Sequence, residues 1–126
     1  MAAARDHYLK GLALFGRDEH VEAIDEYRKG LALEPENTEI LLAMATAQMN
    51  AGRLDEAIAT GRRLVELDAT DPFAHTSLSM MYQRKGLIDE AEREQAKARM
   101  LSWKQELKKN PDAPPPGPAG GMGVVQ

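Results

Sequence analysis

The stretch LDEAIATGRRLVELDATDPFAH, residues 54–75, holds one helix-forming run, a single Asp-Pro break and the start of a second run. A close counterpart of its first part, IDEAEREQAKARMLSW, begins at Ile88. Alanine, leucine, glutamate, arginine and glutamine dominate both runs, and these residues have high helix propensity. Proline is tolerated in the first turn of a helix, because the N–H it lacks would have no partner there. The sequence therefore predicts a fold in which similar helix–turn–helix units stack on one another.

Small residues recur along the chain with a period of 34 residues. They form two sets, Ala23, Ala57 and Ala91, and Gly11, Ala45 and Ser79. Two antiparallel helices approach closely only where at least one of them carries small side chains. We therefore expect the second set, on the first helix of each unit, to face the first set on the second helix.

The same period places helix boundaries. Gly52 and Gly86 fall where a first helix should end, and the acidic pairs at 55–56 and 89–90 suit the N-terminus of the next helix. The expected helices are 5–16, 20–33, 38–51, 55–67, 72–85 and 89–109. The predicted organisation is a repeat domain over 1–109, with units at about 4–37, 38–71 and 72–105, followed by a Pro/Gly-rich tail at 110–126.

Composition restricts the class of protein. The chain has 126 residues, 43% of them hydrophobic, which suffices for one modest core. It has no Cys, which removes disulfides, thiolate metal sites and a Cys nucleophile, and its net charge of -4 argues against nucleic acid as the main partner. No signal peptide or membrane-inserting segment is recognised, so a cytoplasmic protein is expected.

The motifs resemble the tetratricopeptide repeat family over about residues 4–105. The matching positions are Gly11, Ala23, Tyr27 and Pro35, then Gly52 and Ala57, then Pro72, Tyr82, Gly86, Ala91 and Ala98. The sequence departs from the family at His7, Leu41 and His75, where an aromatic is common, and at Gly61 and Gln95, which replace the aromatic found at Tyr27. The resemblance implies an all-α, right-handed α-solenoid of three repeats with an extended C-terminal helix.

The resemblance also implies a concave groove lined by the first helix of each unit, which in the family holds a peptide or a partner helix. Residues expected in this groove are Tyr8, Leu12, Phe15, Leu42, Thr46, Met49, Phe73, Ser77, Met80 and Gln83. Some of them, Leu42 and Phe15 among them, would alternatively belong to the packing between helices. One subgroup of the family grips a C-terminal carboxylate with Lys, Arg and Asn. The matching positions here are Tyr8, Leu12, Ala43, Phe73 and Ser77, so we expect no such clamp.

The sequence shows no pattern that indicates an enzyme. His7 and His75 occupy equivalent places and should pack between helices, whereas His20 is assigned to a turn. The acidic pairs lie on separate helices, so no metal site is expected, and no cofactor motif is recognised.

The last helix carries a second apolar stripe, Ala96, Met100, Trp103 and Leu107. Trp103, the only Trp of the sequence, could close the end of the solenoid as a lid, or Met100, Trp103 and Leu107 could form a second interface. The tail beyond it is either disordered or docks on a partner through a polyproline segment at 114–118 and an apolar end at Met122, Val124 and Val125.

Two roles follow from this sequence. The first is a binding module, an adaptor or chaperone-like protein that holds a segment of a partner protein in the apolar groove. The second is a structural subunit or self-associating scaffold, held in a larger complex or homo-oligomer through the C-terminal helix and tail. The partner's identity is not encoded in any motif.

Overall fold

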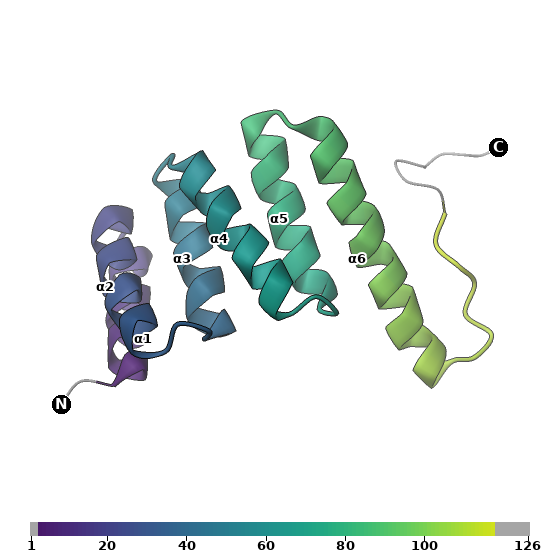
Figure 1. The fold of residues 1–126 in the computed structure, drawn as a ribbon, viewed down its shortest axis with the longest axis horizontal. Coiled ribbons are helices and arrows are strands. Elements are labelled where there is room, and N and C mark those ends of the chain that lie inside the picture. The colour runs from purple at the N-terminus through teal and green to yellow at the C-terminus, as the bar shows by residue number, and fades with distance from the viewer. Residues whose placement is uncertain (1–2, 118–126) are drawn as a thin grey trace.

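The computed structural model describes residues 3–117, which form six α-helices and no β-strand. The helices are α1 (Ala4–Gly16), α2 (His20–Leu33), α3 (Thr38–Asn50), α4 (Leu54–Leu67), α5 (Pro72–Lys85) and α6 (Ile88–Lys109). Figure 1 shows them succeeding one another along the long axis of the molecule, each beside its neighbours in the chain. The all-α fold of three helix–turn–helix repeats is confirmed, and every helix bound lies within one residue of its expected place.

Local chemistry explains where the helices begin and end. The Asn37 side chain accepts a hydrogen bond from the Ile40 N–H at 3.0 Å, which caps α3, and Asp71 caps α5 through the Phe73 N–H at 3.0 Å. Gly52 and Gly86 follow α3 and α5 with φ of 80° and 87°, a left-handed conformation that glycine adopts without steric cost. Asp18 takes the equivalent place after α1, with φ of 61°.

The core runs through the stack rather than lying inside single repeats. Between the first and second repeats, Ile24, Tyr27, Ile40 and Met44 are buried together. Between the second and third repeats the buried cluster contains Met49, Ile58, Leu78, Met81 and Tyr82. Because each repeat buries its apolar face against the next one, the repeats stabilise one another.

The small residues allow close helix crossings, as expected, with one difference. In the third repeat the Ser79 hydroxyl donates to the Ala91 carbonyl oxygen at 2.8 Å, across the α5–α6 crossing. In the first repeat, however, it is the ring of Tyr27 that lies against Gly11, and a Cβ on residue 11 would overlap that ring. Residue 11 has to be glycine because its missing side chain leaves room for the Tyr27 ring.

The missing aromatic at residue 61 also has a structural reason. A Cβ added to Gly61 would lie 2.8 Å from Met81 Sδ and 3.1 Å from Leu78 Cδ1. These two side chains come from α5, in the following repeat, and they fill the space that an aromatic ring would need. In the second repeat, side chains of the third repeat therefore occupy the space that an aromatic side chain at residue 61 would fill.

His7 and His75 pack between helices, and each contacts a glutamate of the second helix of its repeat. The Nδ1–Oε1 distance is 2.9 Å for His7 and Glu26, and 2.7 Å for His75 and Glu94. A lysine three residues further on completes each group, since Lys29 and Lys97 donate to these glutamates at 3.0 Å. The first and third repeats thus share the same His–Glu–Lys group, which is half-buried in the first repeat, whereas its His and Glu are buried in the third. His20, assigned to a turn from the sequence, is instead the first residue of α2.

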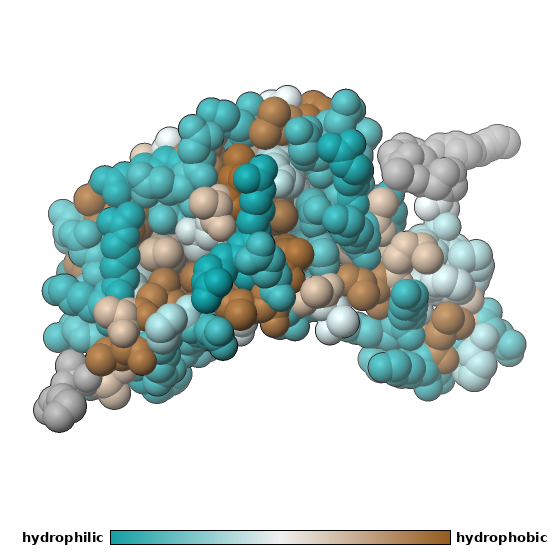
Figure 2. All heavy atoms as spheres, viewed as in Figure 1, coloured by the Kyte–Doolittle hydropathy of each residue, from teal (hydrophilic) through white to brown (hydrophobic). Residues whose placement is uncertain are grey.

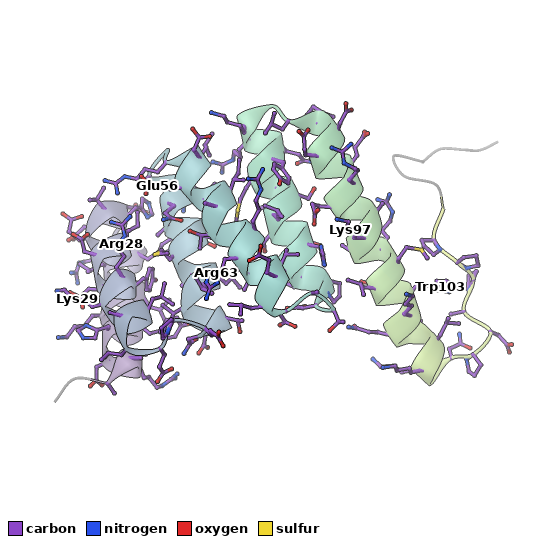
Figure 3. All side chains as sticks on the ribbon, in the orientation of Figure 1. Arg28, Lys29, Glu56, Arg63, Lys97 and Trp103 are labelled. Atoms are coloured by element: carbon purple, nitrogen blue, oxygen red, sulfur yellow. The ribbon has the colours of Figure 1, made fainter. Side chains whose placement is uncertain are left out.

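The surface is largely hydrophilic on the face seen in Figure 2, with hydrophobic side chains gathering towards the lower middle of the view. Ion pairs connect successive repeats, such as Arg28 with Glu56 at 3.3 Å (Figure 3) and Lys85 with Asp55 at 3.1 Å. Exposed pairs of this kind each stabilise a fold by roughly 0–1 kcal/mol, so they add little beside the core. Within residues 3–117, no helix combines the length and apolar character needed to cross a membrane.

The tail is described only as far as residue 117. Residues 111–112 form a turn after α6, and residues 113–117 have no regular secondary structure. The apolar end predicted at Met122, Val124 and Val125, and the last proline of the 114–118 segment, lie outside the described residues. The division into a repeat domain and a tail stays a prediction.

Candidate binding groove

An apolar depression lies between the first helices of the first two repeats. It encloses about 370 Å³ and is lined by Tyr8, Leu12, Phe15, Tyr27, Glu39, Leu42, Ala43 and Thr46. Seven of these eight residues belong to α1 and α3, and Tyr27 comes from α2. The depression brings together five of the ten side chains that the sequence assigned to a groove, namely Tyr8, Leu12, Phe15, Leu42 and Thr46. It is called the apolar pocket below.

Burial separates the base of the apolar pocket from its accessible wall. Tyr27 is fully buried, whereas Leu12 keeps 40% of its surface exposed. Tyr8, Phe15 and Leu42 are half-buried. These three side chains therefore have two roles: they pack against the core, and they also present carbon atoms to the pocket.

A second, smaller depression of about 130 Å³ adjoins the apolar pocket and shares Leu42 and Glu39 with it. Its other lining residues are Thr38, Leu64, Asp68, Asp71, Phe73 and Ala74. Phe73 is 59% exposed, the largest fraction among the exposed large hydrophobic residues of the described chain. This depression is called the acidic pocket below, because three carboxylates line it.

The remaining predicted groove residues divide into two groups. Met80 is 49% exposed and Gln83 is also exposed, so both are accessible on α5. Met49 and Ser77 are buried, and their assignment to a ligand surface was wrong. Met49 packs into the cluster between the second and third repeats.

The electrostatics of the groove differ from those of a site for a carboxylate. Burial raises the pKa of the Tyr8 hydroxyl, and the neighbouring Glu39 carboxylate raises it further. Arg5 lies 5.9 Å from the centre of the Tyr8 ring and 3.8 Å from Glu39, at the edge of the pocket. Among the residues that line either pocket, none is Lys or Arg.

Sequence reasoning missed Glu39, Asp68 and Asp71 as groove residues. Glu39 was detectable in principle, because positions 39, 42 and 46 share one face of a helix. Asp68 and Asp71 lie in the turn between α4 and α5, and no helical period extends through a turn. Their place beside α3 depends on how the repeats stack.

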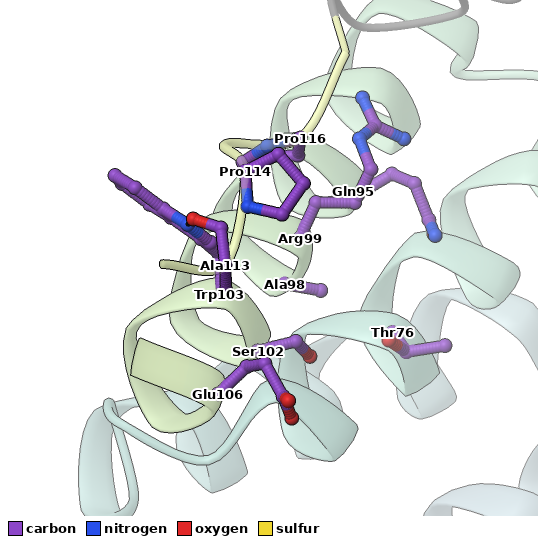
Figure 4. Close-up of a pocket in the computed structure, with 10 residues that line it drawn as sticks. All are labelled: Thr76, Gln95, Ala98, Arg99, Ser102, Trp103, Glu106, Ala113, Pro114 and Pro116. Atoms are coloured by element: carbon purple, nitrogen blue, oxygen red, sulfur yellow. Dashed lines mark hydrogen bonds between the residues drawn. The ribbon is translucent and has the colours of Figure 1, made fainter. Parts of the chain in front are cut away.

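The C-terminal end of the solenoid carries a separate hollow of about 470 Å³. Its lining residues come from α5, α6 and the segment after α6, and Figure 4 shows Trp103 close to Ala113 and Pro114. The Trp103 indole N–H donates to the Ala113 carbonyl oxygen at 3.0 Å, and Ala113 is buried. Trp103 is therefore partly covered by the chain's own tail.

The three side chains proposed as a second interface do not line a common hollow. Trp103 lines the hollow beside the tail, whereas Met100 lines a different one of about 400 Å³, with Ala69 and Lys104. Leu107 is half-buried and lines neither of these hollows. A single continuous stripe through all three residues stays a prediction.

The contact between Trp103 and Ala113 allows a spectroscopic prediction. Deleting residues 111–126 removes the Ala113 carbonyl and exposes the indole, so we expect the tryptophan emission of the isolated protein to shift to longer wavelength. Deleting only residues 118–126 leaves Ala113 in place and should not shift the emission. Identical emission from both truncated proteins and the full chain would contradict the contact.

Stacked helix pairs with an apolar groove along their first helices define the chain as a protein-interaction module of the α-solenoid class. A family model described as tetratricopeptide repeat matches residues 14–81, more than half of the chain. The chain belongs to the tetratricopeptide repeat family.

Two groups of known proteins resemble the chain. Photosystem I assembly protein Ycf3 of Synechococcus sp. (strain CC9605) is 30% identical over 114 residues, which cover 83% of this chain and 66% of that protein. The crystal structure of MamA matches with a TM-score of 0.78 at 27% identity, covering 82% of this chain and 61% of that one. The chain thus spans less than two thirds of the length of each of these two proteins.

A third similarity concerns the fold alone. The second tetratricopeptide domain of Spaghetti (RPAP3), solved with the HSP90 peptide SRMEEVD, matches with a TM-score of 0.72 at 20% identity. The alignment covers 78% of this chain and 91% of that domain.

Proposed function

We propose that this chain binds a segment of a partner protein, an extended peptide or a helix, in its apolar pocket and thereby acts as an adaptor or chaperone-like binder. The observation that carries the proposal is the pocket itself, in which Tyr8, Leu12 and Leu42 present accessible carbon surface between two repeats. Covering one Leu or Phe side chain completely stabilises a complex by ~1.5–3 kcal/mol. The RPAP3 domain, which holds a peptide on the same fold, supports this type of binding.

The proposal does not extend to the peptide that RPAP3 holds. The five positions of the family's carboxylate clamp are Tyr8, Leu12, Ala43, Phe73 and Ser77, and these side chains are apolar or neutral. Three of them line the apolar pocket, where they offer carbon atoms and the Tyr8 hydroxyl. A peptide that ends in a carboxylate next to acidic residues would meet no cation among the lining residues of the pocket.

The test compares two leucines of the same helix. Leu12→Glu places a charge inside the apolar pocket, whereas Leu9→Glu places one at a site that is 48% exposed and lines neither pocket. We expect Leu12→Glu to weaken partner binding by about 10- to 100-fold, the equivalent of ~1.5–3 kcal/mol, and Leu9→Glu to leave it unchanged.

The experiment is a capture from native lysate with both variants and the unchanged chain, quantified by mass spectrometry. Circular dichroism should show the same helicity and nearly the same melting temperature for all three proteins. Proteins captured equally by the two variants would contradict a ligand site in the apolar pocket.

A second candidate role, a subunit of a larger complex or a homo-oligomer, is favoured by α6. This helix has 22 residues against 14 in α2 and α4, and Figure 1 shows its C-terminal end extending past α5. Met100 on it is 43% exposed. Size-exclusion chromatography with light scattering separates the roles, since a monomer favours the adaptor and a defined oligomer favours the scaffold.

A further inference from the structure

The two pockets of the groove form one surface of mixed chemistry. Leu42 and Glu39 line both of them, so a ligand side chain in the apolar pocket lies next to a side chain placed in the acidic pocket. An extended peptide advances ~3.3 Å per residue, so two such side chains belong to positions only a few residues apart. The groove therefore offers two adjacent places for neighbouring side chains of one ligand.

The acidic pocket has the charge that attracts a cation. Glu39, Asp68 and Asp71 line it, and its other lining residues are neutral. Asp71 Oδ1 is engaged by the Phe73 N–H at 3.0 Å, and Glu39 is 60% exposed with its nearest cation, Arg5, at 3.8 Å. Asp68 is the C-cap residue directly after α4, where the helix dipole adds negative potential. The carboxylates are thus only partly compensated.

An aromatic ring strengthens this preference. Phe73 lines the acidic pocket with more than half of its surface exposed. The face of an aromatic ring attracts an ammonium or guanidinium group that lies within about 6 Å of its centre. Lys or Arg of a ligand would therefore meet carboxylates and a ring face at the same place, whereas Asp or Glu would meet like charge.

From these observations we infer that the preferred partner is a cationic segment, in which a bulky apolar residue fills the apolar pocket and a Lys or Arg a few residues away enters the acidic pocket. This inference rests on the proposed function and specifies its ligand. It also gives a reason for the charge of the chain, since a net charge of -4 steers a basic segment towards the protein.

The test begins with a display library of random short peptides, selected against the full chain. We expect the enriched peptides to combine a bulky apolar residue with Lys or Arg nearby and to be poor in Asp and Glu. One enriched peptide, labelled with fluorescein, is then compared with its Lys-to-Glu counterpart by fluorescence polarisation. The counterpart should bind at least about tenfold more weakly, and the difference should shrink as salt is added.

Charge reversal on the protein makes the test specific. The double variant Glu39→Lys and Asp68→Lys should prefer the Lys-to-Glu peptide, and Glu66→Lys should behave as the unchanged chain. Glu66 is the matched control because it is exposed on α4 and lines neither pocket. Asp71 is left unchanged because it caps α5. If the reversed protein does not fold, Glu39→Gln with Asp68→Asn replaces it and should abolish the preference.

The outcomes separate this inference from the proposed function. Enriched peptides that lose binding on Leu12→Glu but are indifferent to charge, or are acidic, overturn the cationic ligand and leave the groove as the binding site. Peptides that bind Leu12→Glu as well as the unchanged chain, or no enrichment at all, overturn both.

Discussion

Tyr27→Ala is expected to destabilise the protein by about 3–5 kcal/mol, the typical cost of truncating a buried aromatic side chain. Tyr27 has no exposed surface, packs against Gly11 and closes the base of the apolar pocket. Burial also raises the pKa of its hydroxyl to about 12, so the ring is neutral at any pH used for the measurement. The measurement is chemical denaturation, with unfolding monitored by circular dichroism.

The matched control is Tyr27→Phe, which keeps the ring and removes only the hydroxyl. We expect it to cost less than about 1 kcal/mol, because the volume that fills the space above Gly11 is preserved. If the alanine and phenylalanine variants were equally stable, the ring would not hold the first repeat together, and the packing between α1 and α2 would need another explanation.

The second large effect is expected at the buried polar group of the third repeat. Glu94→Ala should destabilise the protein by roughly 2–4 kcal/mol, because it leaves the His75 ring without its partner. The side chains of His75 and Glu94 are only 6% and 12% exposed. Both ring nitrogens face oxygens that accept hydrogen bonds, Glu94 Oε1 at 2.7 Å and the Ala69 carbonyl at 2.8 Å.

This effect should depend on pH, with a defined sign. Burial alone would raise the pKa of Glu94, but the hydrogen bonds from His75 and Lys97 outweigh it and leave the pKa below its ordinary 4.5. A carboxyl whose pKa is lowered by folding stabilises the native state above its unfolded pKa, and this contribution disappears as the pH falls through the folded pKa. The gap between the unchanged chain and Glu94→Ala should therefore be widest near neutral pH and narrow below about pH 4.5.

Glu26→Ala in the first repeat is the comparison for this experiment. Its pKa is also lowered, by the hydrogen bond with His7 and then that from Lys29, but the pair is more exposed, at 15% and 17%. Water can hydrogen-bond to the unpaired His7 ring more easily there, so we expect Glu26→Ala to lose less stability than Glu94→Ala. A gap for Glu94→Ala that stays constant from neutral to acid pH would contradict the role of the carboxylate.

The sequence alone determined the helices and their repetition. Helix propensity, the caps at Asn37 and Asp71 and the glycines at 52 and 86 act within a few residues, so a 34-residue period makes them visible without coordinates. The apolar pocket was partly predictable for the same reason, because Leu12 and Tyr8 share one face of α1 by helical period. The His and Glu residues of the first and third repeats also occupy equivalent positions of the 34-residue period.

Only the tertiary structure decided which apolar side chains stay accessible and where charge gathers. Met49 and Met80 both belong to first helices, yet the first is buried and the second is half exposed, because burial depends on the repeat stacked alongside. Glu39 and Asp68 are far apart in the chain and line one pocket only because α3, α4 and α5 pack together. Local periodicity specifies the face of a helix, whereas the stacking of repeats, a sum of many distant contacts, specifies what that face meets.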